Sequence, residues 1–254
     1  FDSKIKLIED IKYSRIEKSE NPEILYPEIN TEFLDPPEDS SYIKYISPTI
    51  LLQQFEDEYD VIHTDEEPVL RRKPKNMGTL IHSLLQPLGS LHHGKKINMS
   101  QILKDDHSFI NDSLSFSENE IQKAKKIIEK IKSNDIINKI ESSDLSRSEL
   151  QIHKKYGKYI LMGILDKIIK KDNKWEIIDY KYTFQPEKMR KKHIFQMEFY
   201  IYLCKEIFSV EKATLLYVNT GNIFEVYLND EEDFKKRLNE MINSYQKKVI
   251  ESLY

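Results

Sequence analysis

The chain has 254 residues, of which 39% are hydrophobic and 32% are charged, and its formal net charge is −4. This length suits one large domain, or one domain with an appendage. The slightly acidic balance excludes a protein that binds polyanions over its whole surface, so any nucleic-acid site has to be a local basic patch. The sequence has only six glycines and no GxxxxGK[ST] string, which argues against a phosphate-binding loop.

Cysteine usage and hydropathy narrow the class of protein further. Cys204 is the only cysteine, which excludes a disulfide framework, a zinc ribbon and an iron–sulfur cluster held by cysteines. No apolar run approaches about 18 residues, so no membrane span is expected, and residues 1–10 do not resemble a signal peptide. We therefore expect a cytoplasmic protein. Because the sequence does not start with Met, we also expect it to be part of a longer polypeptide.

The first part of the chain is expected to be an appendage. Residues 1–45 are interrupted by four prolines with acidic residues between them, which is typical of an arm or linker. The domain itself is predicted to occupy residues 46–254. It opens with a helix in which Ser47 is the N-cap and Pro48 takes the first helical position.

A helical region is predicted to follow. Residues 71–75 form a basic loop, and residues 77–87 form a short apolar helix that ends near a proline. Residues 88–108 are expected to be loop. Residues 117–142 carry isoleucines at helical spacing behind a capping box, which predicts one long helix.

From residue 149 the apolar spacing changes from helical to alternating. This pattern predicts a strand, a tight turn and a second strand, followed closely by a third strand. A helix, a hairpin and a charged amphipathic helix complete the chain. The predicted ranges are 149–171 for the first two strands, 175–183 for the third, 188–208 for the helix, 213–228 for the hairpin and 231–252 for the last helix.

Two carboxylates in the central hairpin are the most informative feature. Asp is depleted in strands and like charges facing each other are destabilising, yet Asp166 and Asp179 each lie within an apolar run. A turn centred on Asp172–Asn173 would place Asp166 directly opposite Asp179, with Cβ atoms about 5 Å apart. Alternation then puts Lys181 on the same face as Asp179.

Such a cluster suits a divalent cation. A carboxylate pair by itself costs stability or raises one pKa, whereas Mg²⁺ is held by one or two carboxylates together with waters and phosphate oxygens. Lys181 can then orient or deprotonate an attacking water, or stabilise charge on the phosphate. The alternative is that Lys181 and Asp179 form an ordinary surface ion pair. The apolar strand around Asp166 and the converging register favour the metal site.

Four short motifs make the sequence resemble the PD-(D/E)XK nuclease superfamily, in its RecB-like branch. They are GTLIH at Gly78–His82, GILD at Gly163–Asp166, DYK at Asp179–Lys181 and QMEFY at Gln196–Tyr200, in the family's order. The resemblance implies an α/β fold with a restriction-endonuclease-like core, in which a mixed β-sheet with an antiparallel meander is flanked by helices. The sequence departs from the common DYKT pattern by reading DYKYT.

The resemblance also implies a role for each matched residue. His82, Asp166 and Asp179 would be metal ligands together with the backbone carbonyl of Tyr180. Lys181 would be the catalytic lysine, acting with Asp166 and Asp179. By itself, a histidine on an apolar helix is more often a packed core residue, whereas Gly78 before it and the DYK hairpin after it favour His82 as a ligand.

Other residues are expected to contact DNA. The resemblance implies that Gln196 and Tyr200, which are four apart on one helical face, would lie near the site and the DNA strand. The basic runs at residues 71–75 and 188–192 flank the motifs, so Arg71, Arg72 and Lys191 are expected to bind DNA phosphates. The alternatives left open are ordinary helix residues at Gln196 and Tyr200 and solvated faces for the basic runs. Glu149 is either an extra carboxylate or a plain strand-edge residue.

The function implied is Mg²⁺- or Mn²⁺-dependent hydrolysis of DNA phosphodiesters by an exonuclease acting at DNA ends. The missing start Met and the absence of ATPase motifs indicate the C-terminal nuclease domain of an AddA- or RecB-type helicase–nuclease in DNA recombination and repair. The partners would be DNA and a helicase motor in the same or a partner chain, with no membrane. The alternatives are a catalytically inactive nuclease-like domain that binds DNA or a partner, and a stand-alone nuclease.

Overall fold

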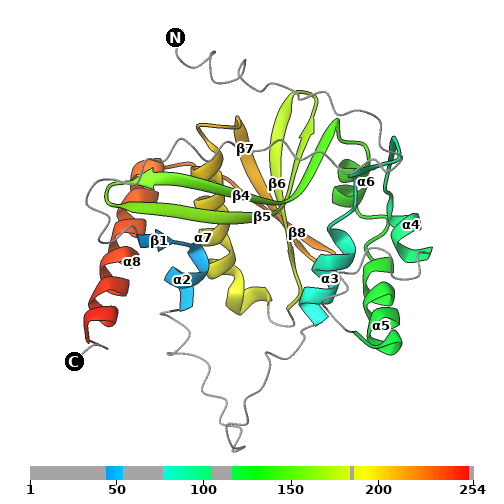
Figure 1. Ribbon diagram of the computed structural model, residues 1–254, viewed down its shortest axis with the longest axis horizontal. Coiled ribbons are helices and arrows are strands. Elements are labelled where there is room, and N and C mark those ends of the chain that lie inside the picture. Colours follow the sequence, from blue (N-terminus) through cyan, green and yellow to red (C-terminus); the bar gives the residue numbers. More distant parts are fainter. Residues whose placement is uncertain (1–43, 54–76, 105–115, 184–185, 252–254) are drawn as a thin grey trace, which may run out of the picture. The chain divides into compact units, whose positions relative to one another are not determined.

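The computed structural model describes residues 44–53, 77–104, 116–183 and 186–251 (Figure 1). The predicted arm, residues 1–45, lies outside them except for its last two residues. The boundary between arm and domain therefore stays a prediction. None of the helices described here has the length and apolar character that a bilayer span requires.

One mixed sheet organises the described residues. Its strands run in the order β1–β5–β6–β7–β8, and β4 pairs with β5. The pairs β1–β5 and β6–β7 are parallel, and the other pairs are antiparallel. The strands are β1 (Lys44–Ile46), β4 (Leu145–Tyr156), β5 (Tyr159–Lys171), β6 (Lys174–Lys181), β7 (Val210–Tyr217) and β8 (Asn222–Val226).

Helices cover both faces of this sheet, as the sequence predicted. One hydrophobic cluster contains Ile177 and the apolar side of α7, and the other contains Ile178 and the apolar sides of α3 to α6. Since successive strand residues point to opposite faces, the two clusters lie on opposite sides of β6. Figure 1 shows α2, α7 and α8 to the left and α3 to α6 to the right. The helices are α2 (Pro48–Gln53), α3 (Met77–Leu85), α4 (Met99–Lys104), α5 (Glu118–Glu129), α6 (Asp135–Glu141), α7 (Pro186–Cys204) and α8 (Glu231–Glu251).

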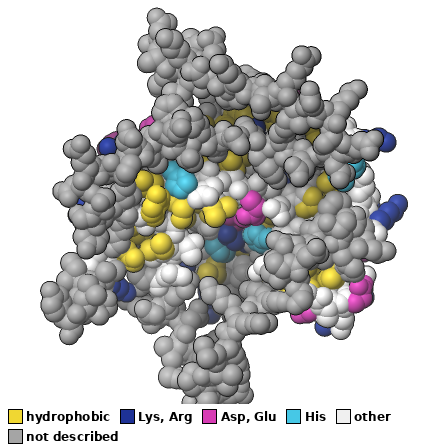
Figure 2. All heavy atoms as spheres, in the orientation of Figure 1, with side chains coloured by type: hydrophobic (Ala, Val, Ile, Leu, Met, Phe, Trp, Pro, Cys, Tyr) yellow, Lys and Arg dark blue, Asp and Glu magenta, His cyan; other side chains and the backbone are white. Residues whose placement is uncertain are grey.

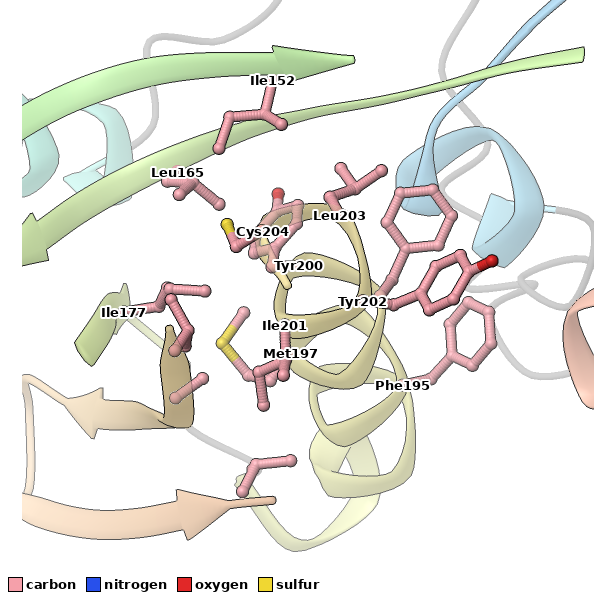
Figure 3. Close-up of a cluster of buried hydrophobic side chains, with 14 of the residues drawn as sticks. Ile152, Leu165, Ile177, Phe195, Met197, Tyr200, Ile201, Tyr202, Leu203 and Cys204 are labelled. Carbon is pink, nitrogen blue, oxygen red and sulfur yellow. The ribbon is translucent and has the colours of Figure 1, made fainter. Parts of the chain in front are cut away.

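The central helix α7 approaches β5 closely at Gly163. Figure 3 shows Tyr200 and Leu203 of α7 on the side of the helix that faces β4 and β5. A Cβ atom added at Gly163 would lie 2.8 Å from a methyl carbon of Leu203 and 2.9 Å from the ring of Tyr200. Close packing thus explains the glycine of the GILD motif, because a side chain at Gly163 would push α7 away from the strand.

Local signals in the sequence are confirmed at several helix and strand ends. The hydroxyl of Ser47 accepts from the backbone N–H of Ile50, and the helix begins at Pro48. Ser117 and Glu120 form the predicted capping box at the start of α5. These interactions involve residues only three apart, so sequence alone is enough to foresee them.

Two predicted segments are wrong. Residues 88–108 contain a small hairpin, β2 (Leu91–His92) with β3 (Lys95–Lys96), and then α4. The hairpin turns at His93 and Gly94, which both have positive φ, and α4 is secured by buried Ile102. The single helix expected over residues 117–142 is two helices, because Asn134 caps a new helix, α6, by accepting from Ile136 N–H.

The turn between β5 and β6 lies at Asp172–Asn173, as predicted. Both residues have positive φ, 51° and 63°, and Lys171 pairs with Lys174 across them. Two such residues form the type I′ turn whose twist suits a two-residue hairpin. The turn therefore sets the register of the two strands that carry the carboxylates.

This turn can be tested at Asn173. Val is β-branched and is strained at positive φ, at a cost of about 1–2 kcal/mol, whereas Gly adopts it readily. We expect Asn173→Val to lower the free energy of unfolding in urea by about that amount. The control Asn173→Gly should stay within about 0.5 kcal/mol of wild type. Equal losses in both variants would contradict the turn assignment.

Candidate active site

One edge of β5 is only partly paired. β1 pairs with Tyr159–Leu161 and β6 pairs with Lys167–Lys171, while β4 occupies the opposite edge along almost the whole strand. Within the described part of the chain, residues 162–166 thus have no strand partner on the edge shared by β1 and β6. Asp166 is the last residue of this gap, immediately before the β5–β6 ladder starts.

The predicted register between the carboxylate strands is confirmed. The ladder runs from Lys171 opposite Lys174 to Lys167 opposite Ile178. Asp166 and Asp179 are the next opposing positions, just where the ladder ends. There the backbone N–H of Tyr180 donates to Oδ2 of Asp166 at 3.0 Å. At the end of the ladder, the Asp166 carboxylate thus takes the hydrogen bond that a backbone carbonyl of β5 would otherwise accept.

Asp166 also lies at an irregularity shared with β4. Leu165 and Ile168 both pack in the α7 cluster although they are three residues apart, so the alternation of faces changes between them. The β4–β5 ladder passes over Asp166 and the opposing Glu149 alike. Glu149 has φ of 51°, which is uncommon for a residue with a side chain. Burial and the charge of Asp166 raise the pKa of Glu149, so Glu149 lies near the site as the extra carboxylate that the sequence allowed.

His82 reaches Asp166 from α3. Its Nδ1 lies 3.2 Å from Oδ2 of Asp166. Burial would lower the pKa of His82, but the hydrogen bond and charge of Asp166 outweigh it, and the pKa is raised. Burial likewise opposes ionisation of Asp166, yet its pKa is lowered by the hydrogen bond and charge of His82 and by the charge of Lys181. The structure therefore brings His82 to the carboxylates instead of leaving it among apolar side chains.

Asp179 is buried beside Lys181. Its exposure is 1%, and its Oδ2 lies 2.7 Å from Nζ of Lys181. The contact is close but poorly directed, because the buried Oδ2 lacks a hydrogen bond of good geometry within the described residues. Burial raises the pKa of Asp179 to about 6, with a further increase from Asp166 and a partial offset from Lys181. This is not the exposed ion pair of the alternative interpretation.

The backbone of Tyr180 points toward the gap, while its ring does not. The ring is 1% exposed and packs in the cluster beneath α3 to α6. The carbonyl of Lys181 accepts from Val218 on the β7 side, and the peptide groups of successive strand residues point to opposite edges. The carbonyl of Tyr180 therefore faces the edge where Asp166 lies, as a metal-ligand role would need.

The predicted DNA-contacting residues are only partly within the described chain. Gln196 Nε2 donates to the hydroxyl of Tyr200 at 2.9 Å on one face of α7. Burial and then the charge of Asp179 raise the pKa of Tyr200, so this face lies close to the carboxylates. Lys191 is exposed on the same helix. Arg71 and Arg72 lie outside the described residues.

Sequence reasoning missed His193, one turn before Gln196. Its Nδ1 lies 2.9 Å from the hydroxyl of Tyr217. Burial, Lys181 and Lys192 together lower its pKa to about 3, so it is a neutral ring near the lysine. Its position three residues before Gln196, on the helical face of the QMEFY motif, is a signal that could have found it.

The donor atoms at the gap fit a divalent cation chemically, although they contact one another. Within the part of the chain that the structure describes, no three side chains of His, Cys, Asp or Glu are grouped to hold one ion. His82 contacts Asp166 and Lys181 contacts Asp179, so each carboxylate is paired with a basic side chain. Two carboxylates, one with a buried oxygen that lacks a hydrogen bond, an imidazole and a backbone carbonyl are nevertheless ligands that Mg²⁺ and Mn²⁺ accept. Figure 2 shows acidic, basic and histidine side chains side by side in the middle of the displayed face.

Comparison with protein families decides the class. The model of the PD-(D/E)XK nuclease superfamily matches residues 57–252. The chain belongs to the PD-(D/E)XK nuclease superfamily. The expected α/β fold, a mixed sheet flanked by helices, is thus confirmed for this PD-(D/E)XK nuclease domain.

Two solved structures are similar to this PD-(D/E)XK domain. A candidate exonuclease from Eubacterium rectale is 12% identical, with a TM-score of 0.42, over 83% of this chain and 80% of that one. The protein SSO0001 is 24% identical, with a TM-score of 0.30, over 38% of this chain and 48% of that one, so this chain spans about half of its length. Neither similarity is high enough to carry an argument about activity. No curated protein matches the sequence.

The electrostatics of Asp179 predict an unusual pH dependence. A carboxyl whose pKa rises from 3.8 to about 6 on folding stabilises the fold while protonated, and this contribution is lost as pH rises through about 6. Without divalent ions, Asp179→Asn should therefore be more stable than wild type near pH 7.5, by up to about 3 kcal/mol. The advantage should shrink toward about pH 5.

Thermal unfolding of wild type and Asp179→Asn across this pH range measures the effect. Glu240→Gln, an exposed substitution on α8, is the control and should show no such trend. A gain in stability that is the same at every pH would contradict the raised pKa.

Proposed function

We propose that this PD-(D/E)XK domain is a Mg²⁺- or Mn²⁺-dependent deoxyribonuclease that hydrolyses phosphodiester bonds. The observation that carries the proposal is the meeting of His82, Asp166, Asp179 and Lys181 at the gap in the β5 edge. These residues come from three elements separated in sequence. An arrangement that holds a half-buried carboxylate near a fully buried one is costly unless it serves a ligand.

The proposed metal ligands are His82, Asp166, Asp179 and the backbone carbonyl of Tyr180. A divalent ion bound there would act as a Lewis acid toward the phosphate and would make water more acidic. The low pKa of Asp166 keeps its carboxylate ionised and able to bind a cation. Asp179, with a pKa of about 6, is ionised for the most part at neutral pH.

Lys181 is proposed to be the catalytic lysine. Its side chain is 17% exposed, so it is partly shielded but can still reach a bound phosphate. Asp179 fixes its position from one side. An ammonium in this partly water-excluded place stabilises the negative charge that develops on the phosphate oxygens more strongly than it would in bulk water.

The α7 helix is proposed to guide the DNA strand. Gln196 and Tyr200 present linked polar groups from α7 near the carboxylates. Lys191, five residues earlier and exposed, is placed to contact a phosphate. Arg71 and Arg72 are proposed to add phosphate contacts from the basic run before α3.

We place the activity at DNA ends, in a helicase–nuclease of recombination and repair. The order of the four motifs supports the RecB-like branch, whose members include nuclease domains joined to helicase motors. A helicase motor in the same or a partner chain is the partner proposed, and the cytoplasm is the proposed location. Linear DNA should therefore be degraded in preference to circular DNA.

The nuclease proposal is tested by incubating linear and circular DNA with the protein and Mg²⁺ or Mn²⁺. We expect Lys181→Ala and Asp166→Ala to lower the cleavage rate by about 10²–10⁴-fold, because each removes a charged group at the reacting phosphate. Lys236→Met, an exposed lysine substitution on α8, is the control and should cut as wild type does. A wild type that binds but never cuts DNA would favour the inactive DNA-binding domain instead.

DNA binding should depend on salt through the basic groups. Lys191→Ala should weaken binding to all sequences alike and reduce the slope of log affinity against log salt by about 1. Fluorescence anisotropy with a labelled duplex at several salt concentrations measures this slope. Lys236→Met should leave it unchanged. A wild-type slope near zero would argue against phosphate contacts altogether.

A further inference from the structure

Lys167 is an enclosed lysine next to the candidate site. It directly follows Asp166 in β5, and its exposure is 0%. Its Nζ donates to the backbone carbonyls of Gln86 at 2.9 Å and Leu88 at 2.6 Å, and contacts Ser148 Oγ at 2.7 Å. The three hydrogens of an ammonium thus have three acceptors, which satisfies the group completely.

These contacts join β5 to the end of α3. The helix ends at Leu85, and Gln86 and Leu88 belong to the turn that follows it. The negative end of a helix dipole attracts a cation there. Ser148 of β4 adds a second link, because its hydroxyl also donates to the Gln86 carbonyl at 2.5 Å. We call the contacts of Lys167 and Ser148 with Gln86 and Leu88 the α3 clamp.

The α3 clamp lies one helical turn from His82. The N–H of Gln86 donates to the carbonyl of His82 at 2.8 Å. Gln86, whose own carbonyl accepts from Lys167, is therefore hydrogen-bonded to the backbone of His82. Lys167 is also bonded covalently to Asp166. One side chain therefore ties together the two backbone segments that carry His82 and Asp166.

We propose that Lys167 is a positioning residue that holds His82 against Asp166 through the α3 clamp. This inference rests on the proposed function, in which both residues bind the metal. Packing alone does not explain a lysine here. Enclosing a charge costs several kcal/mol, and an apolar side chain of similar length would fill the space without that cost. What the ammonium adds is direction, because its hydrogen bonds fix where the end of α3 lies.

The test uses Lys167→Met in the whole chain, since Met keeps an unbranched side chain without the donors. We expect Mn²⁺ affinity, measured by calorimetry, to fall by about 10–100-fold, as it does when groups that orient metal ligands are lost. The cleavage rate at saturating DNA should fall by a similar factor while KM for a duplex stays within about twofold. The ring-nitrogen NMR signals of His82, assigned with His82→Ala, should shift. Lys155→Met, an exposed lysine substitution on β4, should change none of these.

A double-mutant cycle separates positioning from general damage. If Lys167 acts through His82, then Lys167→Met should have little further effect on Mn²⁺ affinity in the His82→Ala background. Equal losses in both backgrounds, or unchanged His82 signals in a folded Lys167→Met protein, would overturn the proposal. Should Lys167→Met not fold, Ser148→Ala takes its place in the same cycle, with a smaller loss of affinity expected and the same shift of the His82 signals.

The two proposals fail in different ways. A wild type that neither binds Mn²⁺ nor cuts DNA would refute the proposed function. In that case the His82 ring signals of Lys167→Met still decide on the α3 clamp, because they report the His82–Asp166 contact itself.

Discussion

The two-residue turn at Asp172–Asn173 is the constraint on which the site depends. It fixes the register of β5 and β6, and a slip of one residue would send every side chain of β6 to the other face of the sheet. Asp179 and Lys181 would then point into the cluster beneath α3 to α6. The positive φ values at the turn thus control the chemistry at the far end of the hairpin.

The second constraint is the cost of holding a half-buried carboxylate, Asp166, near a fully buried one, Asp179. A buried carboxylate needs a partner or a hydrogen bond, and the structure supplies them unequally. Asp166 accepts from the N–H of Tyr180 and contacts His82, so it stays acidic. Among the described residues, Asp179 has only the poorly directed contact with Lys181, and its pKa is raised to about 6. This asymmetry leaves one carboxylate that gains most from a cation, which is the physical basis of the proposed metal dependence.

The site is also where the sheet stops being regular. Within the described part of the chain, β5 has no strand partner on one edge over residues 162–166, and the ladder with β4 passes over Asp166 and Glu149. Irregular strand positions turn side chains away from simple alternation, which lets Asp166 contact His82 of α3 and accept from the backbone N–H of Tyr180 in β6. Lys167, the next residue, has its three hydrogen bonds on the α3 side. A regular strand would alternate its side chains strictly between the two faces of the sheet, so Asp166 and Lys167 could not both reach the α3 side.

The sequence by itself determined the superfamily motifs, the caps of α2 and α5, and the register of the carboxylate hairpin. These depend on residues a few positions apart, whose turn and capping preferences act locally. Only the tertiary structure decided that Glu149 faces Asp166, that His193 lies near Lys181, and that Lys167 reaches the Gln86 carbonyl 81 residues away. It also placed α4 in a predicted loop. The contacts of Glu149, His193 and Lys167 arise from packing between distant segments, which no local pattern encodes, whereas the break between α5 and α6 is marked by a local cap at Asn134.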